Sequence, residues 1–137
     1  WVRIGGGDGF FNVPDPADTN AVYVNSQYLG LTRVDLRTLE ARALRPGNPT
    51  GEAPKKGNWG APPPRVGTYT AHANWDAPLV ASAHDPATLY AGMRLLWKST
   101  DRGQTWTSLG DLTNRVDRRT LRIMGRLPDE RTPSLDD

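Results

Sequence analysis

The chain has 137 residues, of which 17 are basic and 15 acidic, and its formal net charge of +2 is too small to indicate nucleic acid or another polyanion as a partner. It contains no cysteine, which excludes disulfides, thiolate chemistry and cysteine-based zinc sites. No apolar run reaches the roughly 18–20 residues of a membrane-spanning helix, so we expect a protein that does not cross a membrane.

The choice among charged residues points to an all-β fold. Of the 15 acidic residues 12 are Asp, and of the 17 basic residues 14 are Arg. Asp favours turns and caps, whereas Glu and Lys, which are scarce here, favour helices. Together with 14 Gly, 12 Pro and five Trp, this composition predicts short strands joined by tight turns.

Residues 1–44 contain the first predicted unit of four strands. The β-rich or apolar runs are Phe10–Val13, Val22–Val24, Leu31–Val34 and Glu40–Leu44. The segments between them carry the residues that turns require, including the pair Asp15-Pro16. We expect residues 1–4 to be the end strand of a preceding unit of the same kind.

Residues 45–74 are rich in Pro and Gly and have almost no periodicity, which predicts an extended insertion. Trp59 and Tyr69 lie in this insertion, and Trp75 follows it. Such aromatic side chains could anchor a protein interface, stack on sugar rings or pack the insertion onto the strands. We place an interface or packing ahead of a sugar site.

Residues 75–113 form a second predicted unit that parallels the first. Its runs are Leu79–Ala81, Leu89–Ala91, Leu96–Ser99 and Thr105–Leu109. The pair Asp85-Pro86 matches Asp15-Pro16, and the strands that follow it match in order. Repeated four-stranded antiparallel units are typical of β-propeller blades. Because a propeller needs four to eight blades, we expect these two to be part of a larger ring, completed by further blades of the same protein or by other chains.

The turn from Ser99 to Trp106 carries the strongest motif in the chain. It reads Ser99-Thr100-Asp101-Arg102-Gly103-Gln104-Thr105-Trp106. Asp101 can accept hydrogen bonds from backbone amides of the turn, and Gly103 permits a positive φ. Ser99 and Thr105 supply hydroxyls near the carboxylate, and Trp106 supplies a large apolar body. We therefore interpret Asp101 as an organiser of the turn and not as a catalyst.

This motif matches the Asp box, or BNR repeat, of sialidases and sortilin-type propellers. The wider chain resembles the bacterial, sortilin-like BNR propellers that are often labelled glycosyl hydrolases. The resemblance rests on Trp1 to Phe10, Val22-Tyr23, Arg33-Val34-Asp35, Asn74 to Pro78, His84-Asp85-Pro86, Leu89-Tyr90, the Asp box and Asp111-Leu112-Thr113. It departs from the family pattern at Val34–Thr38, where the first unit lacks the Gly and the Trp of the motif. It implies a propeller fold and a periplasmic or extracellular location.

Asp8 and Asp76 are the candidate catalytic pair if the protein is a glycosidase. Each lies a few residues before the first strand of its unit, so both carboxylates would meet near one mouth of a propeller channel. Glycoside hydrolysis uses two such carboxylates, one as acid and one as nucleophile or base. The alternative, which we favour, is that both residues organise turns.

Residues 114–137 form an Arg-rich segment. Its arginines are Arg115, Arg118, Arg119, Arg122, Arg126 and Arg131. We interpret it as a solvated connector to a further blade, and an acidic partner is the alternative. No cofactor or metal site is expected.

Taken together, these residues predict a non-enzymatic propeller module that acts as a scaffold or protein-interaction subunit of a larger extracytoplasmic assembly. The alternative is part of a secreted BNR-type glycoside hydrolase or of a carbohydrate-binding propeller, with a glycan as its ligand.

Overall fold

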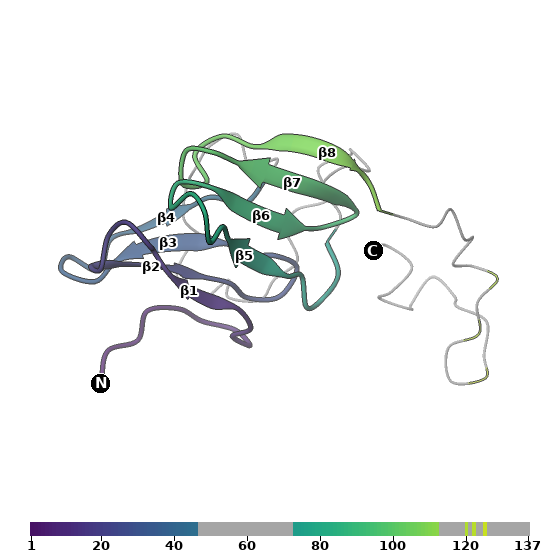
Figure 1. The fold of residues 1–137 in the computed structure, drawn as a ribbon. Helices are drawn as coiled ribbons and strands as arrows, with labels where there is room; N and C mark the ends of the chain where they lie inside the picture. Colours follow the sequence, from purple (N-terminus) through teal and green to yellow (C-terminus); the bar gives the residue numbers. More distant parts are fainter. Residues whose placement is uncertain (47–72, 113–119, 121, 123–124, 126–137) are drawn as a thin grey trace.

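The computed structural model describes residues 1–46 and 73–112, together with residues 120, 122 and 125. Within these residues the fold is all-β, with no α-helix, and the strands form two four-stranded antiparallel sheets (Figure 1). The first sheet consists of β1 (Asn12–Pro14), β2 (Ala21–Val24), β3 (Thr32–Asp35) and β4 (Ala41–Ala43). The second consists of β5 (Leu79–Ala81), β6 (Leu89–Gly92), β7 (Leu95–Ser99) and β8 (Thr107–Asp111). In both sheets the strands are neighbours in chain order, so each sheet is a meander.

All eight predicted strands are confirmed, with ends that differ by a few residues. The largest difference in the second sheet is at β8, which begins at Thr107 and not at Thr105. Thr105 is held by Asp101 through both its backbone amide and its hydroxyl, and these bonds keep it in the turn before the strand.

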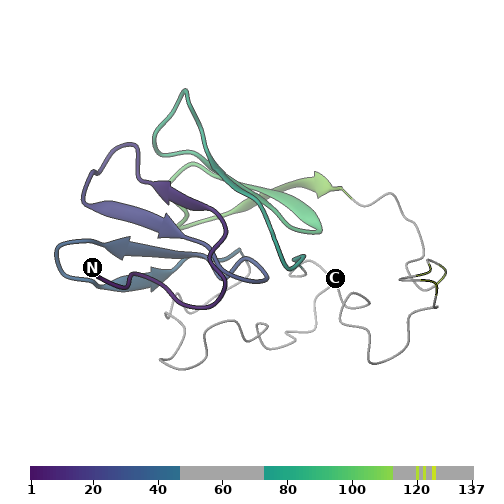
Figure 2. The ribbon, with the colours of Figure 1, turned by 90° about the horizontal axis from the view of Figure 1, so that it is seen from below.

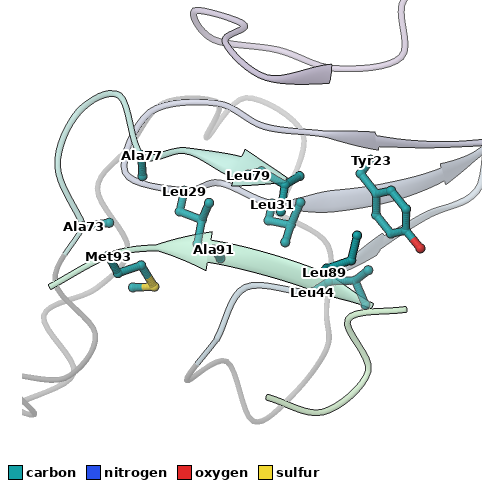
Figure 3. Close-up of a cluster of buried hydrophobic side chains, with 10 residues drawn as sticks. All are labelled: Tyr23, Leu29, Leu31, Leu44, Ala73, Ala77, Leu79, Leu89, Ala91 and Met93. Atoms are coloured by element: carbon teal, nitrogen blue, oxygen red, sulfur yellow. The ribbon is translucent and has the colours of Figure 1, made fainter. Parts of the chain in front are cut away.

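The main core lies between the two sheets (Figures 1 and 3). Side chains alternate between the two faces of a strand, so Tyr23 points from the first sheet toward the second, and Leu89 and Ala91 point back. Figure 3 shows these side chains facing one another. The buried members of the cluster are Tyr23, Leu29, Leu31, Leu44, Ala73, Ala77, Leu79, Leu89, Ala91 and Met93.

A smaller cluster covers the opposite face of the first sheet. Val22, Val24 and Val34 pack there against Ile4. Residues 1–4 are not a strand, but the segment before β1 crosses this face on the side away from the second sheet (Figure 2). An added Cβ on Gly5 would lie 2.6 Å from a methyl carbon of Val24, so the close approach of this segment requires glycine.

The two sheets repeat each other at the level of cross-strand pairs. Tyr23 pairs with Arg33 between β2 and β3, and Tyr90 pairs with Lys98 between β6 and β7. These pairs have the same place in their sheets.

The equivalence of Asp15-Pro16 with Asp85-Pro86 needs a correction. Asp85 accepts from Ala87 N and its carbonyl accepts from Thr88 N, just before β6. Asp18 makes the same two bonds, with Asn20 N and Ala21 N, just before β2. Asp15 makes them too, with Ala17 N and Asp18 N, but farther from β2, so Asp18 is the aspartate whose position matches that of Asp85. The loop between β1 and β2 thus contains two Asp turns. The additional turn explains why the Asp-Pro pair lies farther from the next strand in the first sheet than in the second.

Candidate functional site at the junction of the two sheets

The Ser99–Trp106 turn connects β7 to β8, the third and fourth strands of the second sheet. One carboxylate oxygen of Asp101 accepts from the Ser99 hydroxyl and from Thr105 N, both at 2.8 Å. The other oxygen accepts from the Thr105 hydroxyl at 2.5 Å. Burial raises the pKa of Asp101, but the hydrogen bonds from Thr105 and Ser99 outweigh it, and the net effect is a lowered pKa. The carboxylate is therefore occupied by the turn itself.

Ser99 and Gly103 form the buried side of the turn. The buried Ser99 oxygen accepts from Gly103 N at 2.8 Å and from Asp101 N at 3.3 Å. Gly103 has a φ of +85°, which L side chains rarely adopt. The hydrogen bonds that the motif predicts at this turn are thus present.

This turn also joins the two sheets. The indole of Trp106 donates from Nε1 to the carbonyl of Leu44, at the end of β4, at 2.7 Å. A Cβ added to Gly103 would lie 3.0 Å from Cδ1 of Leu44. The turn of the second sheet therefore packs on the last strand of the first, through one hydrogen bond and one close backbone approach.

At the other end of the sheets, Asn25 links the segments that carry Asp8 and Asp76. Its carbonyl accepts from Phe10 N at 3.2 Å, and its side-chain amide donates to the carbonyl of Ala77 at 2.7 Å. The two aspartates thus lie on segments that meet at one buried residue. Both side chains are exposed, and within the described part of the chain neither makes a hydrogen bond or an ion pair.

Trp75 lies at this same end and is 45% exposed. Its ring meets that of Tyr28 edge to face, with centroids 5.2 Å apart, and its carbonyl accepts from Tyr28 N at 3.1 Å. The side chain is thus held partly by packing while a large part of it faces solvent. Trp59, Tyr69 and most of the insertion and of the Arg-rich segment lie outside the described residues.

A polar cluster that the sequence analysis missed lies on the inner face of the first sheet. Asp15, whose side chain is fully buried, accepts from the Tyr23 hydroxyl at 3.1 Å and from Nη2 of Arg33 at 3.0 Å. Arg33 also bridges to Asp18 at 3.0 Å. Burial and the Asp15 carboxylate raise the pKa of Tyr23 to about 12. Burial lowers the pKa of Arg33, but its hydrogen bonds to Asp15 and Asp18 raise it by more.

The sequence feature that could have revealed this cluster is a tyrosine followed by a cation on the next strand. It occurs as Tyr23 with Arg33 and again as Tyr90 with Lys98. In the second sheet Ser82 follows β5 where Asp15 follows β1, and Lys98 lies over the Tyr90 ring at 5.9 Å from its centroid. The buried carboxylate is therefore particular to the first sheet. All members of the cluster satisfy one another, which indicates a structural role.

No family of known proteins, curated protein or solved structure matches this chain. In the described part of the chain, His, Cys, Asp and Glu nowhere form a group of three or more that could hold a metal ion. No helix among those residues is long and apolar enough to span a membrane. The functional proposal therefore rests on the arrangement of the two sheets and on their junction.

Proposed function

We propose that this chain is a non-enzymatic interaction module, made of two blades of a sortilin-like BNR β-propeller, that scaffolds a larger assembly in the periplasm or outside the cell. The observation that carries the proposal is the orientation of the two sheets. Equivalent residues of the two sheets point in the same direction and do not face each other.

Tyr23 and Tyr90 make this orientation explicit. Tyr23 points from the first sheet into the core between the sheets. Tyr90, its counterpart, lies on β6 between Leu89 and Ala91, which both point into that core, so its own side chain points to the far side of the second sheet. Two sheets related by a two-fold axis would bury both tyrosines at one interface. Sheets stacked head to tail have unlike faces at their two ends, and further sheets can continue the stack.

The junction supports the same interpretation. Trp106 and Gly103 of one sheet contact the end of the last strand of the sheet before it. A contact between consecutive repeats is the kind that a propeller or another repeat architecture reuses at each step.

Asp101 and Asp15 have structural roles, so neither carboxylate is free for catalysis. Both oxygens of Asp101 are occupied by turn bonds. Asp15 is occupied by Tyr23 and Arg33. The resemblance of the sequence to secreted propellers supports the extracytoplasmic location.

Electron cryomicroscopy of the protein, isolated under mild conditions with whatever it binds, tests the proposal. We expect a further four-stranded sheet on each outer face, stacked in the orientation that the second sheet has on the first. Outer faces that remain in solvent, or a neighbour packed in mirrored orientation, would overturn the proposal.

A further inference from the structure

The far side of the second sheet repeats the residue types at four positions of the inner face of the first sheet. We call it the outer face of the second sheet, and it is made by Val80, Tyr90, Leu96 and Lys98. Their counterparts in the first sheet are, in the same order, Val13, Tyr23, Leu31 and Arg33. Each pair matches in character: an aliphatic side chain, a tyrosine, a leucine and a cation.

These two faces differ in what covers them. Tyr23 and Leu31 are almost fully buried, because the second sheet lies on them. Val80 is 56% exposed, and Tyr90, Leu96 and Lys98 are only partly buried. The same surface is thus a filled interface in one sheet and an open one in the other.

The complementary surface is also present in this chain. Leu89 and Ala91 of the second sheet pack on Tyr23, and their counterparts in the first sheet are Val22 and Val24. These valines lie on the outer face of the first sheet, with Ile4 over them and with Pro14 and Ala41 exposed beside them. Each copy therefore carries one face of each kind, at opposite ends.

We propose that the outer face of the second sheet binds the outer face of the first sheet of a second copy of this chain. This inference rests on the proposed function, because it assigns to a second copy the next sheet in the stack. An interface between unlike faces is heterologous, so it leads to closed rings or open chains of copies, and the smallest such ring has two copies and four sheets.

The segment before β1 modulates this association. Trp1–Gly5 repeats the pattern of Trp106–Gly110, in which Trp is followed after two residues by Ile or Leu and then Gly. Ile4 rests on the valines of its own first sheet, whereas its counterpart Leu109 is 52% exposed. In the docked pair, Leu109 of one copy takes the place that Ile4 holds on the first sheet of the other copy. The association therefore competes with the internal contact of Ile4, and it becomes favourable only as the concentration of the chain rises.

Analytical ultracentrifugation of the full chain over a range of concentrations tests the inference. We expect concentration-dependent oligomers, either closed rings of about two to four copies, which hold four to eight sheets, or open chains. Val80→Arg places a charge beside Tyr90 on the outer face of the second sheet, and Ala41→Arg blocks the outer face of the first sheet. Both positions are exposed, and circular dichroism verifies the fold of each variant. Each variant alone should associate at least about tenfold more weakly than the unmodified chain.

The deciding measurement is the equimolar mixture of the two variants. Each keeps the face that the other lacks, so the mixture should form one heterodimer that grows no further. Leu36→Arg, at an exposed leucine of the β3–β4 turn, is the control and should associate like the unmodified chain.

Two results would overturn the inference: an unmodified chain that is folded and monomeric at all concentrations, or variants whose mixture does not associate. Neither would decide the proposed function, because microscopy of the isolated assembly can still find a sheet from another protein on the same face.

Discussion

The Asp101 carboxylate accepts three hydrogen bonds, one from Ser99 and two from Thr105, and all of them are local to one turn. Replacing Asp101 with Ala leaves the amide and hydroxyl of Thr105 without this acceptor. We expect Asp101→Ala to lower the free energy of unfolding by about 1–2 kcal/mol, measured by urea denaturation.

Asp76→Ala is the matched control, since Asp76 is an exposed aspartate with no bond within the described residues. A similar loss in both variants would mean that the turn bonds do not stabilise the fold.

The Tyr23 hydroxyl donates to the buried Asp15 carboxylate and shares it with Arg33. Tyr23→Phe keeps the ring in the core and removes only this bond. We expect a loss of about 1–2 kcal/mol in the free energy of unfolding, because a buried charged acceptor loses one of its donors. Tyr90→Phe changes the equivalent tyrosine, whose hydroxyl has no such acceptor among the described residues, and should change stability by less than about 0.5 kcal/mol.

The same cluster makes one tyrosine titrate late. Burial and the Asp15 carboxylate raise the pKa of Tyr23 to about 12, from an ordinary value of 10.0. A folded-state pKa above the unfolded one means that the native state holds its proton more tightly. Its contribution to stability is complete below about pH 10 and is lost as the pH rises through about 12. Absorbance of tyrosinate in the unmodified chain and in Tyr23→Phe isolates the contribution of Tyr23, which should appear only near pH 12 or with unfolding. A Tyr23 contribution that appears near pH 10 in the folded protein would contradict the cluster.

At the scale of elements, the β7–β8 turn acts as the attachment of one sheet to the other. Gly103 combines a φ of +85° with a position where a Cβ would lie 3.0 Å from Leu44. Gly110 also has a positive φ, +138°, but nothing lies within 4 Å of its Cβ position. A side chain at Gly110 would thus meet backbone strain alone, whereas one at Gly103 would meet both the strain and the neighbouring sheet.

We expect Gly103→Ala to destabilise the protein by about 1–3 kcal/mol, since it combines strain with a collision against Leu44. Gly110→Ala should cost less, because it has the strain without the collision. Thermal unfolding of both variants measures the difference. Equal effects would show that the contact with Leu44 does not matter.

At the scale of the whole molecule, the two sheets form a stack with unlike ends and not a closed unit. The core between them is buried, but the outer face of the second sheet leaves Val80 more than half exposed. A stack of this kind gains stability from each added neighbour.

The two aspartates first considered for catalysis allow a test of function at this scale. In a scaffold, Asp8→Asn and Asp76→Asn remove charge from exposed side chains and touch neither sheet face. We expect the double variant to keep its stability within about 0.5 kcal/mol and to keep its binding partners, as measured by unfolding and by co-purification. Loss of a glycan-hydrolysing activity in this variant would instead support the enzymatic alternative.

The strands and their turns could be predicted from local residue patterns alone. Local residue types suffice for this, because β-branched and aromatic runs form strands and Asp, Gly and Pro form the turns between them. The Ser99–Trp106 turn is the clearest example: all the groups that bond Asp101 lie within four residues of it, so their spacing in the chain already places them together.

Which sheet faces meet depends on contacts between residues far apart in the chain, and these could not be predicted from local patterns. The sequence could not reveal that Asp15 lies under Tyr23 and Arg33, because these residues are 8 and 18 positions away and come together only through strand register. For a related reason the sequence suggested Asp15, and not Asp18, as the counterpart of Asp85. The Asp-Pro motif does not indicate how far the aspartate lies from the next strand. The direction in which the sheets stack could not be predicted from local sequence patterns either. It depends on which side of each sheet is buried, and that is settled by contacts such as Trp106 with Leu44, which are 62 residues apart.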